Sequence, residues 1–140
     1  MYIKQISIFG EDKLGRLAEI TKILSDSKIN IRALSIADTT DSGVLRLVVD
    51  NPDLAQHMLQ EKGLTVNTTD VLGVCVDQMP DGLAALLKFL DDKNIAIEYM
   101  YAFTESGHET HSIVLLHLDK QEEALALFQE NNMKLATMAI

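Results

Sequence analysis

The fold is decided by residues 9–31, which read Phe-Gly-Glu-Asp-Lys-Leu-Gly-Arg-Leu-Ala-Glu-Ile-Thr-Lys-Ile-Leu-Ser-Asp-Ser-Lys-Ile-Asn-Ile. They begin at the end of a predicted strand and pass through a polar turn between Gly10 and Gly15, where glycine permits a tight backbone. Apolar residues then recur at helical spacing as far as Ser27, and Ile29-Asn30-Ile31 changes to the two-residue period of a strand. A loop that enters a helix presents unpaired N–H groups and partial positive charge, so this loop can hold a small carboxylate without a basic side chain.

The same pattern occurs a second time in the chain. Leu17 and Leu83 are separated by 66 residues, and so are Ile29 and Ile95, which keeps the helix and the following strand in register. A pattern that returns at one fixed spacing indicates an internal repeat. We therefore predict two tandem repeats, at residues 1–69 and 70–140.

Charge and composition exclude several classes of function. The 140 residues carry a formal net charge of −9, which argues against binding to a phosphate backbone or to an anionic membrane surface. No apolar run reaches the roughly 20 residues needed to cross a bilayer, and the first residues do not resemble a signal peptide. A single cysteine, Cys75, excludes an internal disulfide and fits a reducing compartment. We expect a cytoplasmic protein without nucleic-acid or membrane partners.

Each repeat predicts the element order strand, helix, strand, strand, helix, strand. Right-handed crossovers then give a four-stranded antiparallel sheet with both helices on one face, which is the ferredoxin-like arrangement of the α+β class. The predicted strands are 3–9, 29–37, 44–49 and 64–69 in the first repeat, and 71–77, 95–103, 110–118 and 134–140 in the second. Exposed edge strands invite pairing, so we expect the two sheets to join edge to edge into one eight-stranded sheet.

The central strands, 44–49 and 110–118, carry apolar residues on both faces. This pattern predicts that the sheet face without helices is also buried, and a homodimer packed sheet to sheet would bury it. The second helix of repeat two is predicted to begin with Asp119 as its cap and Glu122 three residues later, which is the spacing of a capping box.

These residues resemble the ACT domain family, the small regulatory modules of amino-acid metabolism. That family opens its first helix with Asp-x-Pro-Gly-x-Leu and continues with Gly-Ile-Asn-Ile or a similar run. Here residues 12–17 read Asp-Lys-Leu-Gly-Arg-Leu and residues 28–31 read Lys-Ile-Asn-Ile. In the second repeat, residues 78–83 read Gln-Met-Pro-Asp-Gly-Leu and residues 94–97 read Asn-Ile-Ala-Ile. The first copy lacks the proline, and the second shifts the glycine by one position and lacks the asparagine.

The resemblance implies a non-catalytic module that binds an amino acid between two paired modules, and that acts as a sensor or as the regulatory partner of a metabolic enzyme or regulator, as a homodimer. The ligand would lie between the loop before the first helix of one module and the second strand of its neighbour. The loop amides would bind its carboxylate, Asp12 its ammonium, and Asn30 either group. The residues that the resemblance assigns to ligand binding are Asp12, Leu14, Gly15, Asn30, Ile31, Met79, Pro80, Asp81 and Gly82.

Each of these residues also has a purely structural explanation. Gly15 can serve close helix–strand contact, Asp12 can cap the helix, and Asn30 can be a solvated residue at a strand start. The histidines at 108 and 111 lack the spacing that places two metal ligands on one helical face, so we expect no metal and no cofactor.

Three other functions are alternatives. The first is an oligomerisation or protein-interaction module without a functional ligand site, which requires only that exposed edge strands pair. A small ferredoxin-like enzyme would need a poised arginine or histidine, but Arg16, Arg32 and Arg46 are scattered, and we find no motif for a nucleophile. RNA recognition uses exposed aromatic residues on the central strands, whereas these strands are aliphatic.

Overall fold

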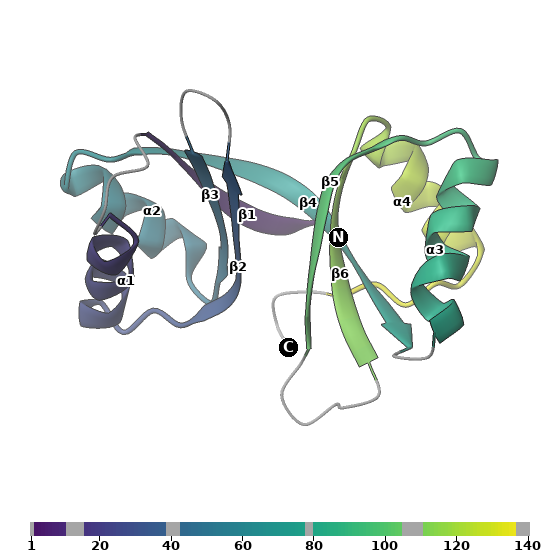
Figure 1. The fold of residues 1–140 in the computed structure, drawn as a ribbon, viewed down its shortest axis with the longest axis horizontal. Coiled ribbons are helices and arrows are strands. Elements are labelled where there is room, and N and C mark those ends of the chain that lie inside the picture. Colours follow the sequence, from purple (N-terminus) through teal and green to yellow (C-terminus); the bar gives the residue numbers. More distant parts are fainter. Residues whose placement is uncertain (1, 11–15, 39–42, 78–79, 105–110, 137–140) are drawn as a thin grey trace. The chain divides into compact units, whose positions relative to one another are not determined.

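The computed structural model describes residues 2–10, 16–38, 43–77, 80–104 and 111–136 (Figure 1). The chain divides into two compact units. The first unit comprises residues 4–69, and the second comprises residues 70–140 together with residues 1–3.

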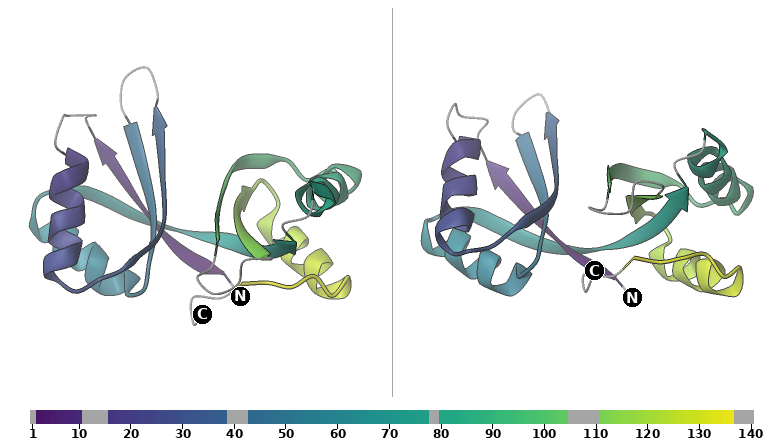
Figure 2. Two further views of the ribbon diagram at one scale, coloured as in Figure 1. Left: turned by 60° about the horizontal axis from the view of Figure 1, so that its bottom comes forward. Right: turned by 90° about the horizontal axis from the view of Figure 1, so that it is seen from below.

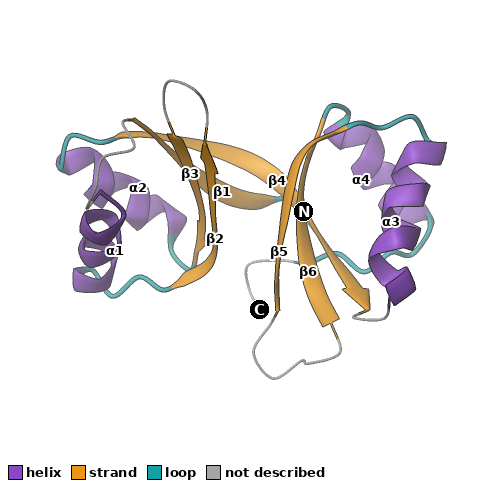
Figure 3. Ribbon diagram, in the orientation of Figure 1, coloured by secondary structure: helices purple, strands orange, loops and turns teal. Residues whose placement is uncertain are grey.

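In the first unit, two helices cover one face of an antiparallel sheet whose strand order is β2-β3-β1-β4 (Figure 3). Aliphatic side chains from both helices and from the central strands form the core between them. Leu24 of α1, Leu47 of β3 and Leu59 of α2 are fully buried there. The elements are β1 (Ile3–Gly10), α1 (Arg16–Asp26), β2 (Ile31–Asp38), β3 (Gly43–Val49), α2 (Pro52–Glu61) and the first part of β4 (Thr65–Asp77).

The second unit repeats this arrangement, with its helices again on one face of the strands (Figure 2). Strand β4 pairs with β6, and β6 pairs with β5, both antiparallel. The core includes Leu72 of β4, Leu90 of α3, Leu116 of β6 and Phe128 of α4. The elements are the second part of β4, α3 (Pro80–Asp92), β5 (Ile97–Thr104), β6 (His111–Leu118) and α4 (Gln121–Glu130).

The described residues form six strands, in the order β2-β3-β1-β4-β6-β5, where the sequence predicts eight. The strands predicted at 64–69 and 71–77 are one continuous strand, β4, which runs through Asp70 without a turn. The segment predicted at 134–140 contributes an isolated bridge between Val74 and Leu135, supported by two backbone hydrogen bonds. The predicted eight-stranded sheet therefore does not form within the described part of the chain.

The four described helices end in the same way, as expected for a chain with an internal repeat. The residue two positions after each helix has a positive φ, namely Lys28 (60°), Gly63 (83°), Asn94 (61°) and Asn132 (54°). In each case the next N–H donates to a buried carbonyl five residues earlier, as Ile29 does to Leu24 at 2.9 Å and Ile95 does to Leu90 at 3.0 Å. This is the Schellman ending, in which an apolar residue follows the left-handed one and packs back on the helix.

The same irregularity interrupts the second strand of each repeat. The register of β2 on β3 shifts between Ile31 and Ala33, and the register of β5 on β6 shifts between Ile97 and Tyr99. These positions are 66 residues apart, the spacing found in the sequence. A β-bulge adds one residue to a strand and bends it. The second strand of both repeats therefore bends at the same point. The ferredoxin-like repeats are therefore confirmed.

The sheet face without helices is buried in the second unit, as the sequence predicts. Ile113 and Leu115 of β6 are each 1% exposed, although they point away from the helices. Ile3 covers this face, because a Cβ built on Gly73 would lie 2.6 Å from Ile3 Cδ1 and 3.6 Å from Ile113 Cγ2. A second copy is therefore not required to bury these side chains.

Candidate functional site

The start of β2 is held by one aspartate. The N–H of Asn30 donates to Asp50 Oδ1 at 3.1 Å, and Nδ2 of Asn30 donates to Asp50 Oδ2 at 3.0 Å. The N–H of Asp50 donates in return to the Asn30 carbonyl at 3.1 Å. The residue that the resemblance assigns to the ligand is thus fixed to the end of the central strand β3 by three hydrogen bonds.

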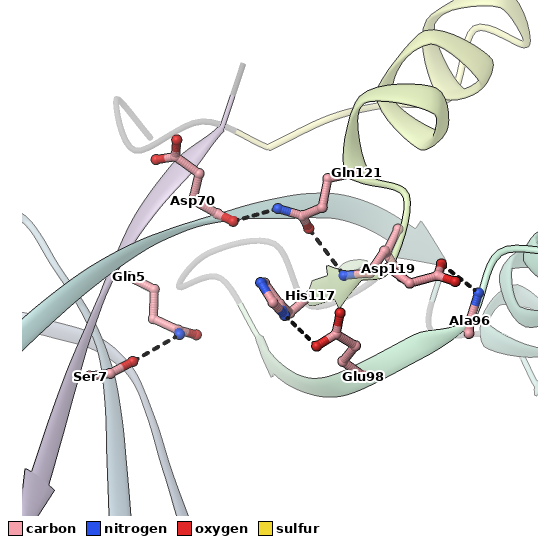
Figure 4. A network of polar contacts seen from close by, with 9 residues as sticks. Gln5, Ser7, Asp70, Ala96, Glu98, His117, Asp119 and Gln121 are labelled. Carbon is pink, nitrogen blue, oxygen red and sulfur yellow. Dashed lines mark hydrogen bonds and ion pairs between the residues drawn. The ribbon is translucent and has the colours of Figure 1, made fainter.

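The second unit keeps the backbone part of this contact and lacks the side-chain part. The N–H of Ala96 donates to Asp119 Oδ1 at 2.9 Å, and the N–H of Asp119 donates to the Ala96 carbonyl at 3.1 Å (Figure 4). Ala96 has no amide with which to use the second carboxylate oxygen. The prediction that Asp119 caps α4 is wrong, because Lys120 is the cap residue and the Asp119 carboxylate binds Ala96 instead.

The contact with Asp50 orients the Asn30 amide. A carboxylate only accepts hydrogen bonds, so the nitrogen of the amide must face it and the oxygen must face away. Oδ1 of Asn30, an exposed residue, therefore faces away from Asp50 as a hydrogen-bond acceptor. An acceptor of this kind suits an ammonium group.

The structure describes five of the nine predicted site residues. Asn30 and Ile31 are adjacent at the start of β2, the first exposed and the second half-buried. Pro80 is the first residue of α3, and Asp81 and Gly82 lie in its first turn. Four residues lie outside the described part of the chain: Asp12, Leu14, Gly15 and Met79. The expectation that a ligand lies between the two repeats stays a prediction.

The first turn of α3 is poorly suited to a carboxylate. Asp81 is exposed there and carries a negative charge close to the N–H groups that would bind an anion. A carboxylate side chain in the first turn already interacts with the positive end of the helix dipole. Both the missing amide at Ala96 and the presence of Asp81 distinguish the second unit from the first.

His117 of the second unit has a packing role. Its ring stacks on Tyr99 with centroids 4.9 Å apart. Its Nδ1 lies 3.5 Å from Glu98 Oε2, as Figure 4 shows. The described residues contain no cluster of three or more histidine, cysteine, aspartate or glutamate side chains that could hold a metal ion. Cys75 is half-buried within β4. None of the helices in the described ranges has the length and apolar character required to cross a membrane.

Sequence reasoning missed Asp50 and Asp119. Each follows the last residue of an apolar central strand, and they are 69 residues apart, which is also the spacing between the α2 and α4 endings. Because an aspartate follows the central strand in both repeats, a comparison of the two repeats could have identified these residues.

Comparison with known protein families decides the assignment. The chain matches the profile described as an ACT domain pair over residues 1–138. The chain belongs to the ACT domain pair family. The resemblance drawn from the sequence motifs is therefore confirmed.

Solved structures share this fold. The protein BT0572 from Bacteroides thetaiotaomicron is 37% identical, with a TM-score of 0.89, over 97% of this chain and 92% of that one. The ligand-free regulatory subunit of aspartate kinase from Thermus thermophilus is 19% identical, with a TM-score of 0.63, over 91% of each chain. The corresponding subunit from Thermus flavus is 19% identical, with a TM-score of 0.53, over 81% of each chain. No curated protein sequence matches the chain.

Proposed function

We propose that this ACT domain pair is a non-catalytic regulatory module that binds a free amino acid, and that its first unit carries the binding site. Membership of the ACT domain pair family supports the regulatory class. The observation that carries the assignment to the first unit is the Asn30 amide, whose Nδ2 is fixed by Asp50 so that its oxygen faces away from that carboxylate.

The ligand would meet two kinds of group from two paired modules, because within one unit the end of β1 lies beside Gly43 and the start of β2 lies beside Val49, at opposite ends of β3. The loop from β1 into α1 of one module would present backbone N–H groups to the carboxylate, as helix N-termini do for anions. Asn30 Oδ1 of its neighbour would accept a hydrogen bond from the ammonium group. Because Asp50 already orients the amide, binding would not have to order that side chain, which lowers the entropic cost of association.

The second unit would bind the same ligand weakly or not at all. Ala96 supplies no acceptor at the position of Asn30, and Asp81 opposes a carboxylate at the start of α3. We therefore expect one functional site in each chain.

The regulated partner would be a metabolic enzyme or regulator. The fold shared with regulatory subunits of aspartate kinase supports a partner of this kind. No cofactor enters this proposal.

Thermal unfolding in the presence of each of the twenty amino acids tests the proposal. A ligand at one hundred times its Kd should add about 2.7 kcal/mol to the free energy of unfolding. One amino acid, or a chemically related group, should raise the Tm of the natural protein, and Asn30→Ala should abolish this rise. Asn67→Ala, which removes an exposed asparagine of β4, is the matched control and should retain the rise.

Each variant is compared with its own ligand-free Tm, because Asn30→Ala also removes a hydrogen bond to Asp50. If none of the twenty amino acids raises the Tm of the natural protein, amino-acid binding is refuted. The oligomerisation module without a ligand site then becomes the favoured function.

A further inference from the structure

The bulge in the second strand carries a charged residue in both repeats. In the first unit Arg32 lies where the register of β2 on β3 shifts, and in the second unit Glu98 lies where the register of β5 on β6 shifts. Both residues are exposed, and they carry opposite charges. Bulges re-aim side chains and occur often beside functional sites. The two repeats therefore present different chemistry at equivalent positions.

Glu98 lies beside a histidine of its own unit. Its Oε2 is 3.5 Å from Nδ1 of His117 on the neighbouring strand, as Figure 4 shows. The equivalent position in the first unit is Val48, which is fully buried and apolar. Val48 offers no polar group to Arg32, and no described residue forms an ion pair or a hydrogen bond with the Arg32 side chain. The guanidinium group of Arg32 is therefore available to a group from outside its unit.

Arg32 lies close to the asparagine of the proposed amino-acid site. Asn30 and Arg32 flank Ile31, which packs against the core beneath the helices, and both flanking residues are exposed. Residues of a strand advance about 3.3 Å each, so the Cα atoms of Asn30 and Arg32 are about 6–7 Å apart. The Asn30 amide and the long Arg32 side chain are therefore within reach of one small ligand.

The charges at the start of β2 have a defined order. Asp50 holds Asn30 and brings a negative charge to that end, and Arg32 brings a positive charge two residues further along the strand. An ammonium group is favoured near Asp50, whereas a carboxylate is favoured near Arg32. A guanidinium group also binds a carboxylate through two parallel N–H donors, which gives it selectivity for this planar anion.

We propose that Arg32 selects an acidic amino acid, aspartate or glutamate, by binding the carboxylate of the ligand's side chain. The inference rests on the proposed function, in which loop N–H groups of the paired module bind the α-carboxylate and Asn30 binds the ammonium group. In the second unit, Glu98 at the equivalent position opposes such a ligand by like charge. The bulge residue thus gives the first unit a specificity that the second unit lacks.

Isothermal titration calorimetry of the full chain with each acidic amino acid and with its amide tests this selection. An acid and its amide have nearly the same size, so the ratio of their Kd values isolates the charge of the ligand's side chain. The natural protein should bind the preferred acid at least about tenfold more tightly than its amide, because a charge-assisted hydrogen bond is roughly twice as strong as a neutral one. Arg32→Gln should reduce this ratio to less than about threefold and leave the Kd of the amide unchanged.

Lys62→Gln is the matched control. It changes the net charge by the same amount, and Lys62 is an exposed residue at the end of α2, whereas Asp50 precedes the start of that helix. This variant should keep the ratio of the natural protein. A purely structural role of Arg32 would weaken the binding of the acid and of the amide equally, so the ratio distinguishes it from a direct contact.

The outcomes separate this inference from the proposed function. A neutral or basic amino acid that binds most tightly, and whose binding requires Asn30, would support the proposed function and overturn selection by Arg32. An acid-to-amide ratio that is the same in the natural protein and in Arg32→Gln would also overturn it. Absence of binding by all twenty amino acids would refute both.

Discussion

Asp50 fixes Asn30 with both oxygens of its carboxylate, at 3.1 Å to the backbone nitrogen and 3.0 Å to Nδ2. The contact joins the end of a buried central strand to the start of an edge strand. It also determines which atom of the Asn30 amide faces outward. One aspartate therefore supports both the local fold and the proposed chemistry of the site.

Replacement of Asp50 by alanine should destabilise the first unit. The change removes two hydrogen bonds to Asn30, one of them to a backbone N–H, and a typical intramolecular hydrogen bond contributes about 0.5–1.5 kcal/mol net. We expect the free energy of unfolding to fall by about 1–2 kcal/mol in urea titrations. Asp53→Ala is the matched control, because Asp53 is 82% exposed and forms only a surface ion pair with Lys4 among the interactions described here. That variant should lose less than about 1 kcal/mol. An equal loss in the two variants would contradict a special role for Asp50.

Replacement of Gly73 by alanine should strain the second unit. The added Cβ would lie 2.6 Å from Ile3 Cδ1 and 3.2 Å from Ala136 Cβ, inside a closely packed region. Overpacking of this kind costs about 1–3 kcal/mol. Ile3→Val removes the Cδ1 atom, so the loss caused by Gly73→Ala should be smaller in an Ile3→Val background than in the natural protein. Strictly additive losses in this double-mutant cycle would show that Ile3 does not cover Gly73.

Substitution of the residues with positive φ after the helices should change the free energy of unfolding by an amount that depends on the residue type. Lys28→Gly should raise the free energy of unfolding by about 0.5–1 kcal/mol, because glycine adopts a φ of 60° without the strain that a lysine Cβ incurs. Asn94→Gly should change it less, since asparagine tolerates this conformation. Gly63→Ala should lower it by about 1 kcal/mol although no atom lies within 4 Å of the new Cβ. A loss of stability in Lys28→Gly would contradict the helix ending described here.

Much of the fold could be predicted from residue patterns. The spacing of Leu17 and Leu83, and of Ile29 and Ile95, revealed the repeat because the core faces of equivalent helices and strands must match. The sequence could not reveal that residues 64–77 form one strand, because strand propensity does not show whether the chain turns between two apolar segments. It also gave no sign that residues 134–136, the described part of the final segment, contribute an isolated bridge at Leu135 in place of a strand.

The candidate site was predictable only in part. Family motifs pointed to Asn30, but its partner Asp50 is 20 residues away and meets it only through the pairing of β2 with β3. The same limit applies to Asp119, whose position before a helix suggested a cap while its carboxylate reaches Ala96 across the sheet. Contacts between neighbouring strands depend on the topology, which local sequence patterns do not show.

The most direct test of the proposed function is a two-dimensional ¹⁵N NMR spectrum of the natural protein, recorded with and without an equimolar mixture of the twenty amino acids. The account predicts that the side-chain amide signals of Asn30 and the backbone signal of Ile31 shift, while the signals of Ala96 and Ile97 in the second unit stay in place. A spectrum that does not change, or one in which only the second unit responds, would contradict it.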